Sequence, residues 1–256
     1  FVHAGGGPLA GQERRLAPLK DLAALDRETF ETKVRCQPAL AADTRLELGS
    51  QRPRVLHVIQ GVSGGGGARA MISLAKYSRR LGGPEHRIVS LLPAERAGLL
   101  LAQQAEVEVI DHPGRNQLRR ELADADIVLV HWWNVPELAS LFRAELPPMR
   151  LALWLHVGGY HSPQVLTPAL IDFADLAVAC SPHTHEHPAF PARPEASGEL
   201  RHAMVLAGAD FERLDGVTPQ PHEGFRVGYI GTLDPVKMHS EFVAMSCAVW
   251  NWGRWA

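Results

Sequence analysis

Short apolar runs alternate with segments of helical periodicity from Arg54 onward. Six runs rich in Val, Ile and Leu indicate strands; they are residues 55–59, 87–92, 107–110, 126–130, 151–155 and 176–180. Nearly continuous apolar runs are typical of parallel strands that helices cover on both faces. We therefore predict an α/β fold in which a doubly wound, Rossmann-like parallel sheet spans residues 54 to about 210.

Changes in composition divide the chain into four parts. Residues 1–52 have mixed polarity, and we interpret them as a leader of unclear structure. Residues 53–212 form the predicted first domain, and the polar, Pro-containing stretch 213–223 has the character of a linker. Residues 224–256 begin with another strand-like run and a helical segment, so we expect the truncated start of a second Rossmann-like domain.

The overall composition is that of an ordinary globular protein. Of the 256 residues, 46% are hydrophobic and 21% are charged, and the formal net charge is −2. Proteins that bind nucleic acids usually carry a basic excess that contacts the phosphates, so we expect no nucleic-acid partner.

The cysteines and the longest uncharged stretch bear on the cellular compartment. Cys36, Cys180 and Cys247 lie far apart without a Cys-x-x-Cys pair, which argues against a disulfide framework and a thiolate zinc site. The absence of paired cysteines favours a reducing compartment, and we expect a cytoplasmic protein. Residues 151–171 contain no Asp, Glu, Lys or Arg, but their prolines and histidines argue against a transmembrane segment.

Four adjacent glycines, Gly64 to Gly67, lie between the first predicted strand and its helix. Because glycine costs backbone entropy on ordering, such a run indicates positive φ or a close approach of the backbone to a ligand. Arg69 follows in the first helical turn, where a cation opposes the helix dipole unless an anion is near. The loop predicts a phosphate site, with a flexible surface turn as the alternative.

Aromatic and imidazole side chains follow the strand at 126–130. His131, Trp132 and Trp133 stand at its predicted carboxyl end, where open α/β sheets bind ligands. Tryptophan offers a flat apolar face with an N–H group, which suits the stacking of a sugar or a base. Tryptophans packed in the core under a helix are the alternative interpretation.

Two further strand ends carry polar groups. His156 follows the strand at 151–155 and precedes Gly158, which leaves room for a ligand beside a ring that can donate to a hydroxyl or phosphate oxygen. A structural histidine is the alternative. Lys237 lies in the turn after the strand-like run 225–231, where its charge suits a phosphate and where a surface lysine would look the same.

Three histidines alternate along one short segment. His183, His185 and His187 would share one face of an extended strand, as metal ligands do. Pro182 and Pro188 bracket the segment, and no clear fourth ligand follows at a longer spacing. We therefore expect no metal site here.

In their order along the chain, these motifs resemble those of the glycosyltransferases of family four, which have the GT-B fold. The resemblance covers residues 54 to about 249. It rests on the Gly-rich loop, the run Asp126–His131, the strand ending in His156, the serine after Cys180, Val-Leu-Ala-Gly-Ala-Asp at 205–210, and Val-Gly-Tyr-Ile-Gly at 227–231 with Lys237.

The resemblance implies transfer of a sugar from a nucleotide-sugar donor to an acceptor hydroxyl, with retention of configuration and without an obligatory metal or cofactor. His156 would contact the donor sugar as the catalytic residue, and Lys237 would neutralise the leaving diphosphate. Thr232 stands where the family commonly has Arg. The acidic Glu-x7-Glu motif of the family would lie beyond residue 256, so we expect this chain alone to be inactive.

The residues expected to bind donor or acceptor are Gly64, Gly65, Gly66, Gly67, Arg69, His131, Trp132, Gly158, Thr232 and Lys237. By the resemblance, the glycines would lie under the donor phosphates and the acceptor. The implied partners are a nucleotide sugar and a carbohydrate, lipid-linked or protein acceptor, with peripheral contact to a membrane as a further option.

Two other function classes stay open. Residues 65–70 fit the relaxed dinucleotide pattern G-x-G-x-x-A, which suggests a nucleotide-dependent oxidoreductase, although no acidic residue ends the second strand to hold a ribose. The other class is a non-catalytic sugar-binding or scaffold module that uses Trp132 and Trp133 as its platform.

Overall fold

The computed structural model describes residues 52–144, 146–147, 149–161, 164–190, 202–218, 220–224, 241–242 and 244–245. The chain divides into two compact units, residues 1–213 and 214–256. The first unit holds the sheet and its helices, whereas most of the second, with the expected start of another domain, lies outside the described residues. All but the last residue of the predicted leader lies outside them as well.

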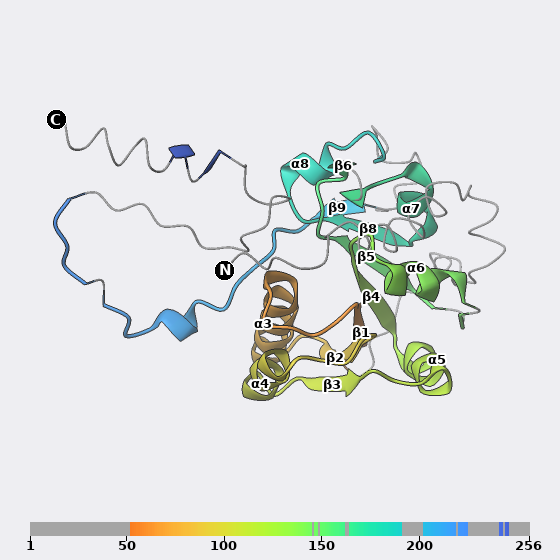
Figure 1. Cartoon of the computed structure of the whole chain (residues 1–256). Coiled ribbons are helices and arrows are strands. Elements are labelled where there is room, and N and C mark those ends of the chain that lie inside the picture. Colours follow the sequence, from red (N-terminus) through yellow and green to blue (C-terminus); the bar gives the residue numbers. More distant parts are fainter. Residues whose placement is uncertain are drawn as a thin grey trace, which may run out of the picture. The chain divides into compact units, whose positions relative to one another are not determined.

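Seven parallel strands form the sheet of the first unit (Figure 1). They are β1 (Arg54–Ile59), β2 (Glu85–Ser90), β3 (Glu108–Asp111), β4 (Ile127–Trp132), β5 (Leu151–Leu155), β8 (Leu176–Ala179) and β9 (His202–Met204). Their order is β3-β2-β1-β4-β5-β8-β9, so the chain reverses its direction of travel between β1 and β4. The short strands β6 (Tyr160–His161) and β7 (Gln164–Val165) form a separate antiparallel pair.

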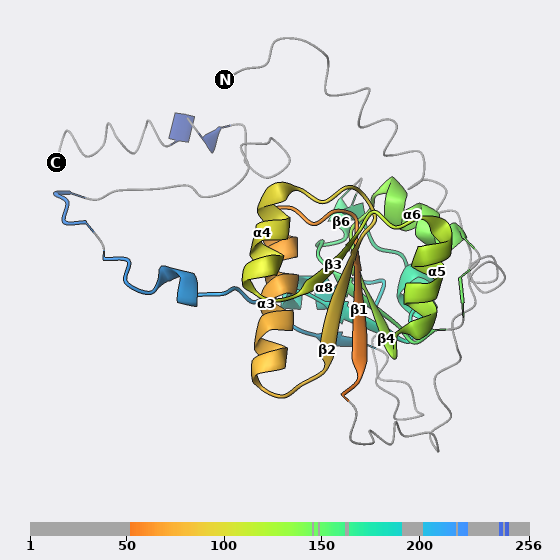
Figure 2. The ribbon, with the colours of Figure 1, turned by 90° about the horizontal axis from the view of Figure 1, so that it is seen from below.

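Helices cover both faces of the sheet, and Figure 2 shows α3 and α4 on one side of it and α5 and α6 on the other. The helices are α3 (Gly66–Arg80), α4 (Arg96–Gln104), α5 (Arg115–Asp124), α6 (Pro136–Arg143), α7 (Pro168–Phe173) and α8 (Pro182–His185). One buried cluster contains Met71 of α3 and Ile59 of β1, and the other contains Leu138 of α6 and Val58 of β1. Because successive strand residues face opposite sides, β1 contributes to both layers.

This architecture confirms the predicted doubly wound, Rossmann-like α/β sheet. Each of the six predicted runs overlaps one strand, namely β1 to β5 and β8. The prediction missed β9 and the β6–β7 pair, because strands of two or three residues contain too few positions for a hydrophobic period.

The connection between β1 and α3, residues 60–65, packs against the connection between β2 and α4. The N–H of Val62 donates to Ser90 Oγ at 3.0 Å, and the N–H of Glu95 donates to the Val62 carbonyl at 2.9 Å. Gly98, in the first turn of α4, has no room for a side chain, since a Cβ there would lie 2.6 Å from the Val62 carbonyl oxygen. Helix α4 therefore fixes the position of the glycine-rich loop.

Gly98→Ala is expected to destabilise the domain by about 1–3 kcal/mol, because its Cβ overlaps a backbone carbonyl that moves only with the loop. Gly66→Ala is a matched change in the first turn of α3, where a Cβ meets nothing within 4 Å. This variant is expected to be neutral or to gain up to about 1 kcal/mol. Urea denaturation measures both free energies of unfolding, and equal changes in the two variants would contradict the packing of α4 on the loop.

Candidate functional site

Three strand ends meet at the carboxyl edge of the sheet. Since β1, β4 and β5 are neighbours, the residues that follow them come together, and the reversal between β1 and β4 is where open α/β sheets bind ligands. A Cβ on Gly67 would lie 3.6 Å from the Trp133 ring, and the Trp133 and His156 ring centroids are 5.9 Å apart. We call residues 60–67, Trp133 and His156 the edge site.

The glycines of the edge site do not adopt a left-handed backbone conformation. Gly65 is the N-cap of α3 with φ −74° and ψ 169°, and none of Gly64 to Gly67 has positive φ, so that alternative for the glycine run is wrong. The N-cap Gly65 has no side chain to cap α3, Ser63 Oγ accepts from the Gly65 N–H at 3.1 Å, and the first turn contains no acidic residue. The amides of Gly66, Gly67 and Ala68 precede the first hydrogen bond of the helix, from Arg69 to the Gly65 carbonyl, so they offer N–H donors to a ligand.

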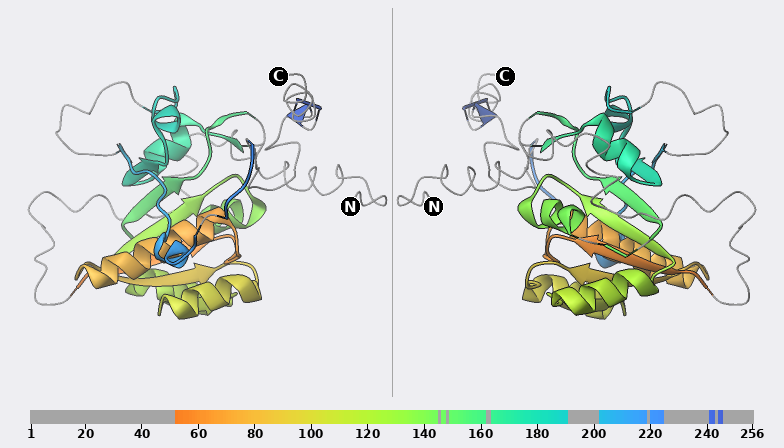
Figure 3. Two further views of the ribbon diagram at one scale, coloured as in Figure 1. Left: turned by 90° about the vertical axis from the view of Figure 1, so that its left-hand side faces the viewer. Right: turned by 90° about the vertical axis from the view of Figure 1, so that its right-hand side faces the viewer.

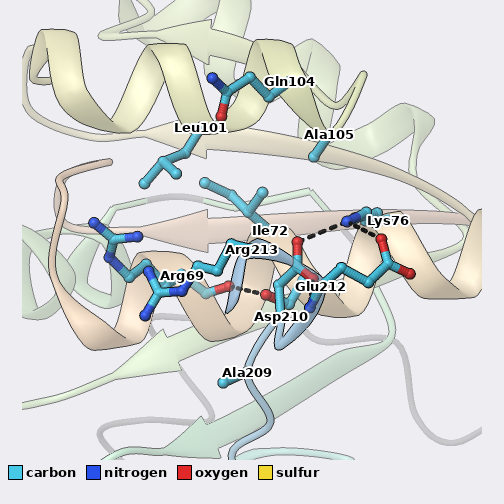
Figure 4. Close-up of a pocket in the computed structure, with 11 residues that line it drawn as sticks. Arg69, Ile72, Lys76, Leu101, Gln104, Ala105, Ala209, Asp210, Glu212 and Arg213 are labelled. Atoms are coloured by element: carbon cyan, nitrogen blue, oxygen red, sulfur yellow. Dashed lines mark hydrogen bonds and ion pairs between the residues drawn. The ribbon is translucent and has the colours of Figure 1, made fainter. Parts of the chain in front are cut away.

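A hydrogen bond holds the Arg69 side chain beside the loop. Its Nε donates to the Gly64 carbonyl at 2.7 Å. Arg69 lines a pocket of about 320 Å³ between α3 and α4, and Figure 4 shows Arg213 at the same end of it. The residues that line this pocket include neither Trp133 nor His156. The structure therefore places the Arg69 side chain in this side pocket, where its Nε contacts the Gly64 carbonyl of the edge site.

The segment after β9 contributes Ala209, Asp210, Glu212 and Arg213 to the lining of the side pocket, and Figure 3 shows this segment crossing α3. Lys76 Nζ donates to Asp210 Oδ2 at 2.6 Å and to Glu212 Oε2 at 2.9 Å, and the Tyr77 hydroxyl donates to Asp210 Oδ1 at 2.8 Å. The hydrogen bond from Lys76 lowers the pKa of both carboxyl groups, and Asp210 raises the pKa of Tyr77 to about 12. The motif at 205–210 thus ends in a contact that ties the chain to α3.

The two tryptophans after β4 have different surroundings. Trp132 is 1% exposed, stacks on Phe142 at a centroid distance of 5.3 Å, and donates from Nε1 to Asn134 Oδ1 at 3.0 Å. The expected ligand contact of Trp132 is therefore wrong, because its ring lies in the core. Trp133 is partly exposed, and its Nε1 donates to Gln60 Oε1 at 3.0 Å. The edge site therefore presents Trp133 and not Trp132.

A row of four histidines crosses the sheet to the edge site. His57 Nε2 lies 2.7 Å from His86 Nδ1, and His57 Nδ1 lies 2.8 Å from His131 Nε2. His131 Nδ1 then lies 2.9 Å from His156 Nε2. These contacts link β2, β1, β4 and the residue after β5 into one chain of hydrogen bonds, which we call the histidine row.

The register of the parallel strands produces the histidine row. His57 lies opposite Leu129 of β4, and His131 comes two residues after Leu129, so both rings lie on the same face. His86 lies opposite Val55, two residues before His57, and His131 lies opposite Trp154, two residues before His156. The row therefore runs diagonally from the start of β2 to the carboxyl edge.

Burial keeps the rings of the row neutral. It lowers the pKa of His57 to about 3, with the neighbouring His86 as a second cause, and lowers the pKa of His156 to about 4. The pKa values of His86 and His131 are lowered for the same main reason. His131 is 0% exposed, so its expected contact with a ligand is wrong, and it contacts His156 instead.

The turn after His156 contains the predicted Gly158, which is exposed and packs near His183. A Cβ on Gly158 would lie 3.6 Å from His183 Cδ2, and Tyr160 stacks on the same imidazole at 4.6 Å. Gly159 has φ +87°, and a Cβ there would lie 2.7 Å from Leu166 Cγ, so this turn requires glycine.

Two of the three alternating histidines lie on the short helix α8 instead of a strand. His185 Nε2 lies 3.1 Å from His202 Nδ1, and His187 Nδ1 accepts from the Ala189 N–H at 3.0 Å. His183 and His187 both pack on the Tyr160 ring, at centroid distances of 4.6 and 4.5 Å. No group of three or more His, Cys, Asp or Glu side chains suited to a metal ion occurs among the described residues.

Reasoning from the sequence missed the members of the site that lie inside strands or support it. His57 and His86 belong to the histidine row, and Gln60 links Trp133 to α6 by donating from Nε2 to Glu137 Oε2 at 2.8 Å. A histidine inside an otherwise apolar run was the available signal for His57, since buried polar groups need partners. The predicted residues Thr232 and Lys237 lie outside the described residues.

Comparison with known proteins finds no protein-family profile and no curated protein that matches the chain. Among solved structures, the chain is similar to the crystal structure of the hypothetical protein SMU.573 from Streptococcus mutans. The identity is 13% and the TM-score 0.30, over 61% of this chain and 67% of that chain. The resemblance to glycosyltransferases therefore stays a prediction. In the part of the chain that the structure describes, no helix has the length and apolar character needed to cross a membrane.

The histidine row predicts a loss of stability in mild acid. The unfolded chain binds protons near pH 6.5, whereas the folded state takes them up only near pH 3 to 4 at His57 and His156. Above pH 6.5 these groups leave the free energy of unfolding unchanged. As the pH falls from 6.5 to 5, this free energy should fall by about 1.4 kcal/mol per pH unit for each ring kept neutral.

Urea denaturation at pH 5 to 7 measures this slope in the wild type and in His57→Gln. The slope of the variant should be smaller by at least the contribution of one proton, about 1.4 kcal/mol per pH unit. His222→Gln, a change at an exposed histidine, is the control and should keep the wild-type slope. A His57→Gln slope equal to that of the wild type would contradict a neutral, buried His57.

Proposed function

We propose that the edge site binds a nucleotide sugar and that the protein takes part in sugar transfer to an acceptor hydroxyl with retention of configuration. One observation carries the proposal: the uncapped start of α3, the Trp133 ring and the neutral His156 ring lie together at the carboxyl edge. The resemblance of the motifs to the glycosyltransferases of family four adds the type of reaction.

Each part of the edge site suits one part of such a ligand. The amides of the first turn of α3 suit the diphosphate, because a helix N-terminus combines N–H donors with a positive dipole end. The Trp133 face suits a sugar or base ring. His156 suits a sugar hydroxyl, and a hydrogen bond that strengthens as the sugar–phosphate bond breaks lowers the barrier.

The remaining roles in this proposal come from the resemblance. Lys237 would neutralise the leaving diphosphate, and Thr232 replaces the arginine common at that position. The acceptor would be a carbohydrate, a lipid-linked group or a protein, and the reaction would need no obligatory metal. Binding of a nucleotide sugar at the edge site is the step that this proposal predicts directly.

The geometry of the loop favours this proposal over a dinucleotide-dependent oxidoreductase. In the dinucleotide fingerprint, the first glycine makes a tight turn directly after the strand. Here residues 60–65 separate β1 from α3, and none of the glycines from Gly64 to Gly67 has positive φ. The match of residues 65–70 to the pattern therefore lacks the backbone turn that gives the pattern its meaning.

Titration of the ¹⁵N-labelled chain with UDP-glucose and GDP-mannose, followed by NMR, tests the proposal. At least one of the two should shift the amides of residues 64–69. His156→Ala should weaken binding about tenfold, because one hydrogen bond is worth about 1 to 1.5 kcal/mol, and Trp133→Ala should weaken it at least as much. His222→Ala, at an exposed histidine, should leave the affinity unchanged.

The same titration distinguishes the competing functions. Shifts with NAD alone would favour an oxidoreductase. Shifts with free glucose that nucleotide sugars do not exceed would favour a sugar-binding module. Either result, or saturable binding that does not change in His156→Ala, would contradict the proposal.

A further inference from the structure

The hydrogen bonds of the histidine row have only two consistent arrangements. A neutral imidazole carries one N–H donor and one lone-pair acceptor. His57 and His131 each use both ring nitrogens within the row, so each donates to one neighbour and accepts from the other. All three bonds therefore point the same way, either from His86 to His156 or from His156 to His86.

A charged ring inside the row would break this rule, because imidazolium donates from both nitrogens. His57 and His131 are both 0% exposed, where the ionised form loses its hydration. Their lowered pKa values, together with those of His86 and His156, keep the whole row uncharged at neutral pH. The choice is therefore between two orientations of one neutral chain.

The far end of the row decides between them. His86 Nε2 is buried and has no hydrogen-bond partner within the described part of the chain. If the bonds pointed towards His86, this nitrogen would be a buried N–H without an acceptor. If they point away from it, only a lone pair goes unused, and orphaned buried N–H groups are the rarer case.

We infer that the row points from His86 to His156, so that His131 Nδ1–H donates to His156 Nε2 and the proton of His156 lies on Nδ1. The ring at the edge site is then a fixed N–H donor that cannot accept a proton at Nδ1. His86, His57 and His131 are positioning residues, because they act only through His156.

This tautomer follows from the row and does not depend on the ligand. Its use rests on the proposed function: a donor at Nδ1 suits a hydroxyl or phosphate oxygen of a nucleotide sugar. The tautomer is measured in the ligand-free protein. If the chain binds no nucleotide sugar, the proposed function fails and the tautomer assignment still stands or falls by its own measurement.

Long-range ¹H–¹⁵N correlation spectra of the histidine-labelled chain at pH 7.5 give the protonation of each ring nitrogen. The His156 signals are assigned by their loss in His156→Gln. The expected result is a protonated Nδ1 and a pyridine-type Nε2. A proton on Nε2, or two nitrogens averaged by exchange between tautomers, would overturn the inference, and this wild-type spectrum decides it alone.

His131→Leu tests whether the row sets the tautomer. Without its donor, the His156 ring should exchange between both tautomers and its two nitrogen signals should move towards each other. His222→Leu is the matched control at an exposed histidine and should keep the wild-type pattern. A folded His131→Leu variant, judged by its amide spectrum, with His156 still fixed as Nδ1–H would show that the row does not position this ring.

Discussion

The parallel pairing of β1 with β4 is the constraint on which the rest of the molecule depends. It joins residues 55–58 to residues 127–130, which are far apart along the chain. The chain first adds β2 and β3 on one side of β1 and then returns to begin β4 on the other side. This reversal puts the crossover helices on opposite faces, and it brings the ends of β1, β4 and β5 together as the edge site.

Hydrophobic pattern alone specifies the register of this pair weakly, because β4 is apolar on both faces. A slip of one residue would put Val130 where His131 now meets His57 and turn the His131 ring to the other face. His57 would then keep an unpaired nitrogen in a fully buried position, at a cost of about 1–3 kcal/mol. The histidine row therefore adds a polar condition on register that the apolar residues do not supply.

The sequence allowed the strands to be predicted where they were long and apolar, and β9 lacked both properties. At the end of β4, the alternation of strand faces could have separated Trp132, in phase with Val128 and Val130, from Trp133. The histidine row was beyond prediction for a different reason. Its bonds join residues 25 to 74 positions apart, and they depend on strand register, which no local pattern contains.

The polarity of the edge site matches the ligand proposed for it. The amides of α3 and the Nδ1–H assigned to His156 are donors, while the carboxylate of Glu137 already accepts from Gln60. Such a set selects ligands rich in oxygen acceptors, and the helix dipole adds a preference for negative charge. Because the pKa of His156 is lowered to about 4, this donor pattern stays the same between pH 5 and 8, where a solvated histidine would change its charge. The edge site would thus bind the proposed anionic, hydroxyl-bearing ligand without a group that titrates in this pH range.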